Sequence, residues 1–190
     1  MRIGLLGGSF DPPHNGHLLG AGDAYEALAL DRVLFIPAAV QPLKAGQASA
    51  PPKDRLEMVR LLANGDERFE VDPIEMNRGG LSYTVDTLST LAGRWPSAEL
   101  FWLVGADVIK SFDQWREPRR ITELATVVVL QRAGDAPDLT SMPGTPRAIA
   151  TRRIDISSTE IRQRVREGKS IRGFVPDAVA AYIATERLYR

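Results

Sequence analysis

The feature that most constrains this chain is the stretch Gly7 to His17, which reads Gly-Gly-Ser-Phe-Asp-Pro-Pro-His-Asn-Gly-His. It follows the apolar run Ile3-Gly4-Leu5-Leu6, which predicts a buried strand, and it precedes a helix that we expect to run to about Leu30. Asn15 or an immediate neighbour can cap this helix, whose free N–H groups and dipole favour an anion such as phosphate. The stretch therefore predicts an anion site in the crevice at the carboxyl end of a strand in an open α/β sheet.

His14 and His17 are the only two histidines among 190 residues, and both lie in this stretch. A step of three residues puts both side chains on one face of a helical turn, so that both imidazoles converge on the anion that the helix end attracts. The alternative is two ordinary histidines in a glycine-rich turn. Their joint position beside a predicted anion site favours a functional role. The stretch spells neither the dinucleotide fingerprint Gly-x-Gly-x-x-Gly nor the Walker loop.

Composition narrows the class of protein. A length of 190 residues suits one domain. The 24 lysines and arginines balance the 24 aspartates and glutamates, so no global field recruits nucleic acid or an anionic membrane. There are no cysteines, which excludes disulfides and thiol catalysis, and no apolar run is long enough for a membrane span or a signal peptide. We expect a soluble cytoplasmic protein, and the sequence is compatible with a monomer or a homo-oligomer.

Strand and helix patterns alternate along the chain. The predicted strands after the first are Arg32–Pro37, one beginning at Phe69–Val71, Glu99–Gly105, Ala125–Leu130 and Arg152–Ile156. The predicted helices after the first are Lys53–Leu62, a helix capped by Ser82 or Thr84 that runs to Gly93, one starting at Ser157, and a closing helix from Pro176 to about Arg187. We interpret residues 38–52 and 133–146 as loops, the second of them mobile. This alternation predicts a single doubly wound, Rossmann-like α/β domain over residues 1–190, with a parallel sheet and a helical C-terminal end.

A second helix start carries several donors. Ser157 and Glu160 fit a capping box, which by itself requires no ligand. Ser157, Ser158 and Thr159 nevertheless bring three hydroxyls, and Arg162 adds a fixed charge, so this helix start also predicts an anion cradle. We expect both cradles to flank one crevice.

Three further positions each have two interpretations. Asp107 follows the strand that ends at Gly105, where its carboxylate either accepts hydrogen bonds from ribose hydroxyls or caps the next helix. Trp115 is either ordinary core or a half-exposed stacking platform, since Asp113, Gln114 and Arg116 around it are polar. Lys44 is the one cation of the loop at residues 38–52 and is either solvated or faces the crevice.

The first stretch resembles the nucleotidylyltransferases that carry the signature Gly-x-Phe-x-Pro-x-His-x-Gly-His, matched here by Gly8, Phe10, Pro12, His14, Gly16 and His17. Three later stretches extend the resemblance to the family of bacterial nicotinate-nucleotide adenylyltransferases. They are Ser-Tyr-Thr-Val-Asp-Thr-Leu at residues 82–88, Gly-Ala-Asp at 105–107 followed by Trp115, and Ile-Ser-Ser-Thr-Glu-Ile-Arg at 156–162. The chain departs from this family at Leu43, where histidine is frequent, and at Arg116, where tyrosine is common.

The resemblance implies adenylyl transfer from ATP to nicotinate mononucleotide, giving deamido-NAD and pyrophosphate without a covalent intermediate. Mg²⁺ would be bound mainly through the ATP phosphates, with no metal ligands from the protein. The implied catalytic residues are His14, His17 and Arg162. The implied ATP site comprises Gly8, Ser9, Phe10, His14, His17, Gly105, Asp107, Ser157, Ser158, Thr159 and Arg162, and the implied mononucleotide site comprises Lys44, Thr84, Trp115 and Arg116.

Two alternatives stay open at the level of sequence. One is a non-catalytic, nucleotide-binding regulatory protein that kept the anion cradle but lost turnover. The other is an adenylyltransferase for a different phosphate substrate, such as phosphopantetheine; enzymes of that kind share the first signature but usually have threonine in place of His14.

Overall fold

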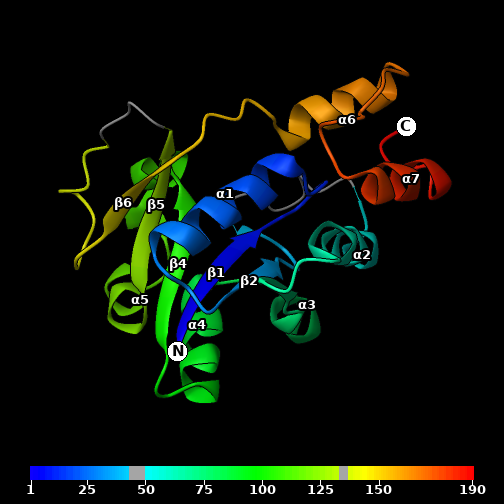
Figure 1. Cartoon of the computed structure of the whole chain (residues 1–190). Helices are drawn as coiled ribbons and strands as arrows, with labels where there is room; N and C mark the ends of the chain where they lie inside the picture. Colours follow the sequence, from blue (N-terminus) through cyan, green and yellow to red (C-terminus); the bar gives the residue numbers. More distant parts are fainter. Residues whose placement is uncertain (43–49, 133–136) are drawn as a thin grey trace.

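The computed structural model describes residues 1–42, 50–132 and 137–190. Within them, six strands form one parallel sheet in the order β3-β2-β1-β4-β5-β6 (Figure 1). The strands are β1 (Arg2–Gly8), β2 (Arg32–Pro37), β3 (Phe69–Val71), β4 (Glu99–Gly105), β5 (Thr126–Arg132) and β6 (Arg147–Thr151). The doubly wound α/β architecture that the alternating pattern predicts is confirmed.

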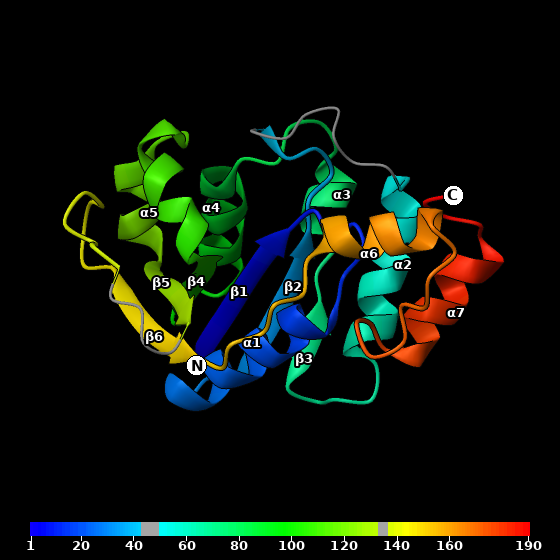
Figure 2. The same cartoon turned by 90° about the horizontal axis from the view of Figure 1, so that it is seen from above.

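Helices cover both faces of the sheet, because side chains that alternate along each strand form two separate buried clusters. One cluster joins the sheet to α1 (Asn15–Ala27), α2 (Pro52–Ala63), α6 (Ser158–Arg166) and α7 (Asp177–Thr185). The other joins it to α3 (Ile74–Arg78), α4 (Thr84–Arg94), the 3₁₀ helix η2 (Ala106–Gln114) and α5 (Pro118–Leu124). Figure 2 shows the two groups of helices on opposite sides of the strands. No helix of the described residues is long and apolar enough to cross a membrane.

The strand order reverses between β1 and β4. β1 pairs with β2 on one side and with β4 on the other, where Leu6 lies opposite Leu103. Crossovers from β1 lead to one face and crossovers from β4 to the other, so the loops after these two strands diverge and leave a crevice. The stretch Gly7 to His17 starts at this reversal, as the sequence predicts.

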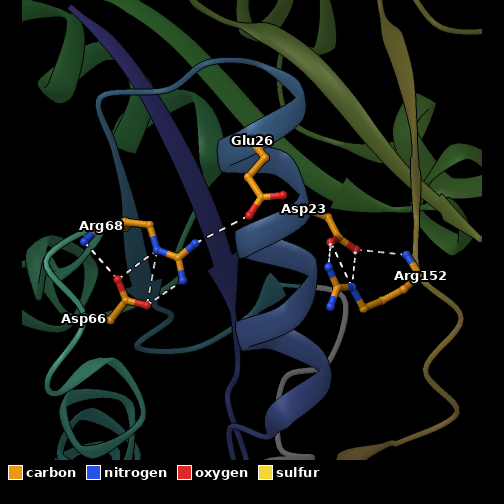
Figure 3. A network of polar contacts seen from close by, with 5 residues as sticks. All are labelled: Asp23, Glu26, Asp66, Arg68 and Arg152. Atoms are coloured by element: carbon orange, nitrogen blue, oxygen red, sulfur yellow. Dashed lines mark hydrogen bonds and ion pairs between the residues drawn. The ribbon is translucent and has the colours of Figure 1, made fainter.

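The last strand is displaced from its prediction. The sequence favours Arg152–Ile156, whereas β6 spans Arg147–Thr151 and residues 152–157 have no regular structure. β6 ends at Thr151, opposite Arg132, the last residue of its partner strand β5. Just beyond it, Asp23 of α1 accepts hydrogen bonds from the Arg152 backbone N–H and from its Nε, both at 2.9 Å (Figure 3). The Arg152 backbone N–H thus bonds to α1, and the chain leaves the sheet and runs over α1 toward α6 (Figure 2).

Several element boundaries differ from the predictions. Neither Ser82 nor Thr84 caps α4: Tyr83 holds the N-cap position, and the Ser82 hydroxyl instead accepts a hydrogen bond from the Ala39 N–H at 2.9 Å. The first and last helices end a few residues earlier than expected, and α3 lies in a segment where no helix was predicted. In the loop at residues 133–146, the described part contains a turn that buries Met142.

Candidate active site

The first anion site is built on the N-terminus of α1, where His14 is the N-cap residue. The His17 Nδ1 accepts a hydrogen bond from the His14 backbone N–H at 3.1 Å, and the two imidazole rings are in contact, with centroids 3.7 Å apart and planes tilted by 31°. Because Nδ1 is the acceptor, the neutral His17 ring carries its proton on Nε2. The predicted convergence of the two imidazoles is confirmed, and His17 keeps one defined N–H donor for a ligand.

Burial keeps both imidazoles neutral at pH 7. It lowers the pKa of His14 to about 4. It also lowers the pKa of His17 well below its usual value, with a further lowering from the neighbouring His14. The His14 Nδ1 is buried and has no hydrogen-bond partner among the described residues. The pair therefore meets an incoming phosphate as neutral polar groups rather than as fixed cations.

Gly16 leaves room for the His14 ring. A Cβ atom at this position would lie 2.9 Å from the His14 Nδ1 and 3.0 Å from its Cε1. Such distances are shorter than ordinary contacts between side chains, so any larger residue would displace the ring. The glycine between the two histidines thus permits the close packing of His14 on the helix start.

The second cradle is attached directly to the loop that precedes α1. The Ser158 hydroxyl donates to the Pro12 carbonyl at 2.8 Å, and the Arg162 Nη1 donates to the Asp11 carbonyl at 2.7 Å. Ser157 caps α6 by accepting from the Glu160 N–H at 3.1 Å, which is one half of the predicted capping box. The Ser158 hydroxyl already has an acceptor, so toward an anion this residue offers its backbone N–H.

Both cradles face one cavity of about 790 Å³ at the carboxyl ends of β1 and β4. The predicted site residues that line it are Gly8, Ser9, Phe10, His14, His17, Thr84, Gly105, Asp107, Trp115, Arg116, Ser157, Ser158, Thr159 and Arg162. Lys44 lies outside the described residues. The prediction that the two cradles flank one crevice is confirmed.

Aromatic and polar side chains also line this cavity. Trp115 is half-buried and packs on Phe112 with ring centroids 5.2 Å apart, which leaves part of its indole facing the cavity. The Arg116 guanidinium lies over the Tyr83 ring at 4.9 Å and pairs with the Asp86 carboxylate at 3.5 Å. The Arg116 side chain is therefore held on the α4 surface. If Arg116 contacts a ligand in the cavity, its backbone N–H is the group available to donate a hydrogen bond.

Sequence reasoning missed Arg55, a buried arginine of α2. Its Nη1 donates to the carbonyls of Ser9 and Ala38, each at 2.7 Å, and its Nη2 donates to the Ala39 carbonyl at 2.9 Å. Burial lowers the pKa of Arg55, and the nearby Asp11 carboxylate opposes this shift. Arg55 thus joins the loop after β1 to the loop after β2. In the sequence, Arg55 lies four residues before Val59 and so shares the buried face of this helix, which was the one indication of its burial.

Glu75 of α3 was also missed. It is buried, lines the cavity and accepts a hydrogen bond from the Thr87 hydroxyl at 2.6 Å. Burial raises its pKa, while hydrogen bonds from Thr87 and Ser82 oppose the shift. The Ser82 hydroxyl thus bonds to Glu75 and also accepts from the Ala39 N–H. These two contacts hold the segment just before Thr84 in place.

Three features together define a nucleotidylyltransferase. They are the doubly wound parallel sheet, the two contacting imidazoles at the start of α1, and the start of α6 with Arg162 on the same cavity. The cytidylyltransferase-like family model matches residues 5–164. A probable nicotinate-nucleotide adenylyltransferase of Gemmatimonas aurantiaca is 54% identical over 198 residues, covering 100% of this chain and 93% of the relative. One from Thermus thermophilus is 47% identical over 190 residues and covers 100% of both chains. The chain belongs to the nicotinate-nucleotide adenylyltransferase family.

Solved structures of low sequence identity share the fold. Plasmodium falciparum nicotinic acid mononucleotide adenylyltransferase complexed with NaAD has a TM-score of 0.82 at 19% identity, covering 99% of this chain and 97% of its own. A putative nicotinate-nucleotide adenylyltransferase from Vibrio parahaemolyticus has a TM-score of 0.71 at 23% identity, covering 100% of this chain and 95% of its own.

Proposed function

We propose that this chain, as a single domain over residues 1–190, transfers the adenylyl group of ATP to nicotinate mononucleotide and releases pyrophosphate, forming deamido-NAD. The observation that carries the proposal is the shared cavity, which is lined both by the two anion cradles and by the half-buried Trp115. Such a cavity suits a triphosphate lying between the helix starts and an aromatic mononucleotide lying beyond it. The relatives at 54% and 47% identity carry the name of this activity.

The reaction makes modest chemical demands on the protein. A phosphate oxygen of the mononucleotide attacks the α-phosphorus of ATP, the bond to the bridging oxygen breaks, and that oxygen leaves on pyrophosphate. The nucleophile is already anionic, so no protein base is required, and catalysis consists of positioning and charge stabilisation. His14 and His17 contact the ATP phosphates, where the His17 Nε2–H donates, while Ser157, Thr159 and Arg162 hold the departing pyrophosphate.

Further roles follow from position along the cavity. Gly8, Ser9 and Phe10 line the cavity in the loop that leads to the first cradle, while Gly105 ends β4 and Asp107 follows it, where the carboxylate can reach a ribose. Thr84 and the Arg116 N–H face the ring and its carboxylate, with Trp115 stacked on the ring. Lys44 stays a predicted contact of the mononucleotide.

We propose that Mg²⁺ enters the cavity bound to the phosphates of ATP. Among residues 1–42, 50–132 and 137–190, no three histidine, cysteine or acidic side chains lie close enough together to hold a metal ion. Mg²⁺ bound through triphosphate oxygens and water needs no such cluster. When bound, the ion neutralises phosphate charge; Arg162 and the start of α6 add to this from the protein side.

The test is a measurement of pyrophosphate release when the protein is mixed with ATP, Mg²⁺ and nicotinate mononucleotide. We expect turnover that depends on all three components, and mass spectrometry should identify deamido-NAD as the second product. Parallel reactions with nicotinamide mononucleotide and with phosphopantetheine define the substrate. ATP binding without pyrophosphate release would refute catalysis and favour a regulatory protein, and preferred use of phosphopantetheine would refute the substrate assignment.

A further inference from the structure

The segment after α7 turns back toward the active-site loop. The Leu188 N–H donates to the Ile183 carbonyl at 3.0 Å, and the Arg187 N–H donates to the Ala184 carbonyl at 3.3 Å. This Schellman pattern needs a left-handed residue, and here Arg187, with φ of 54°, takes the position that glycine usually holds. Tyr189 is left-handed as well, with φ of 64°, and its side chain is buried. Two non-glycine residues in this region indicate that the contacts of Tyr189 hold the turn.

The Tyr189 hydroxyl reaches the loop between β1 and α1. It donates to the Asp11 Oδ1 at 2.8 Å, and the same oxygen accepts from the Ala50 N–H at 3.2 Å. The Asp11 backbone carbonyl accepts from the Arg162 Nη1, which also lies 4.0 Å from the Asp11 Oδ2. One residue therefore connects the phenol of Tyr189 to the guanidinium that faces the cavity.

We propose that Tyr189 is a positioning residue of the polyphosphate site, which fixes the Asp11 loop and through it the guanidinium of Arg162. Tyr189 itself does not line the cavity, whereas Asp11 and Arg162 do. The proposal rests on the proposed function only in assigning pyrophosphate to Arg162. A guanidinium binds two phosphate oxygens with a planar fork, so a small rotation of Arg162 weakens binding more than it would for a point charge.

The chain offers a matched control in Tyr182 of α7. Its hydroxyl donates to the Asp54 Oδ1 at 2.9 Å, and this contact joins α7 to α2. Neither Tyr182 nor Asp54 lines the cavity. Tyr182→Phe and Tyr189→Phe each remove one phenol–carboxylate hydrogen bond and keep the ring, but only the second bond leads to Arg162.

The experiment is a calorimetric titration of each full-length variant with magnesium pyrophosphate, with a thermal unfolding curve for each. Loss of a donor to a charged acceptor predicts that Tyr189→Phe binds pyrophosphate about tenfold more weakly, and Tyr182→Phe within about twofold of wild type. In an Arg162→Lys background, Tyr189→Phe should add less than about threefold, because the phenol acts through the guanidinium.

Equal pyrophosphate affinity of the two tyrosine variants would overturn the proposal. So would independent, multiplicative effects of Tyr189→Phe and Arg162→Lys, which would make the tyrosine a general contributor to stability. The titration requires neither the mononucleotide nor turnover. A wild-type protein that binds pyrophosphate but does not use nicotinate mononucleotide would therefore refute the proposed function and leave this inference to be decided by the variants.

Discussion

Replacing Gly16 by alanine tests the imidazole geometry without removing any functional group. The new Cβ would stand 2.9 Å from the His14 Nδ1 and 3.6 Å from the Ile154 Cγ2. Ordinary contacts of this kind begin at about 3.5 Å, so the His14 ring must move by roughly 0.5 Å. The movement disturbs its contact with His17, whose ring centroid lies 3.7 Å away.

The expected cost in rate follows from that displacement. A misplacement of about 1 Å in an active site can cost roughly 100-fold, so a shift of roughly half that size predicts about a tenfold loss in kcat. Stability should change much less, because Gly16 does not have a left-handed backbone and alanine there reduces the entropy of the unfolded chain by roughly 0.4–1 kcal/mol, which offsets part of the steric strain. A large kinetic effect with a small effect on the free energy of unfolding is the expected signature.

Gly22 of the same helix provides the control, because a Cβ added there meets no atom within 4 Å. Gly22→Ala should gain about 0.5–1 kcal/mol of stability and keep wild-type turnover. Pyrophosphate release measures kcat, and urea unfolding measures stability. If Gly16→Ala turned over as fast as Gly22→Ala, the ring position of His14 would not matter to the reaction.

Three further predictions concern single side chains. His17→Ala should keep the fold and lower kcat roughly 100-fold with a smaller change in ATP affinity, as expected for the loss of a donor to the developing charge; wild-type turnover would remove His17 from catalysis. Trp115→Ala should weaken binding of both nicotinate and nicotinamide mononucleotides. Thr84→Val should weaken binding of nicotinate mononucleotide selectively, because the Thr84 hydroxyl donates to the nicotinate carboxylate. The measurement is kcat/KM for both mononucleotides, and an equal loss for both in Thr84→Val would contradict the prediction. Burial lowers the pKa of His14 from 6.5 to about 4. Below pH 6.5, therefore, His14 binds a proton in the unfolded chain but not in the folded protein, and the free energy of unfolding falls as the pH falls toward 4. Wild type should therefore lose about 2.5 kcal/mol more than His14→Gln in urea unfolding between pH 7 and 4.5, and equal losses would show that the burial of His14 is unimportant.

Local signals in the sequence predicted both anion cradles. His14 and His17 are three residues apart on a helix start, and Ser157 to Arg162 form another helix start, so their geometry is set within one or two turns of chain. The α/β alternation then placed the first cradle correctly, because the first strand of such a sheet ends at the crevice.

Positions that depend on packing between distant segments were not predictable in the same way. Arg55 and Glu75 are charged residues whose burial follows from the loops that fold over them. Arg55 shares a helical face with the buried Val59, but charged residues are so seldom buried that this spacing alone does not predict it. β6 is an edge strand with mostly exposed side chains, so it lacks the apolar pattern of the inner strands, and it ends where its partner strand β5 ends.

The polyphosphate site is joined by contacts between residues far apart in the sequence. Ser158 bonds to Pro12 across 146 positions, and Tyr189 bonds to Asp11 across 178. Such pairs carry a large loop-closure entropy, so in folding they form after the local helices and strand pairs. The site should thus be among the last parts of the molecule to assemble during refolding. Recovery of pyrophosphate binding should lag behind recovery of helical circular dichroism.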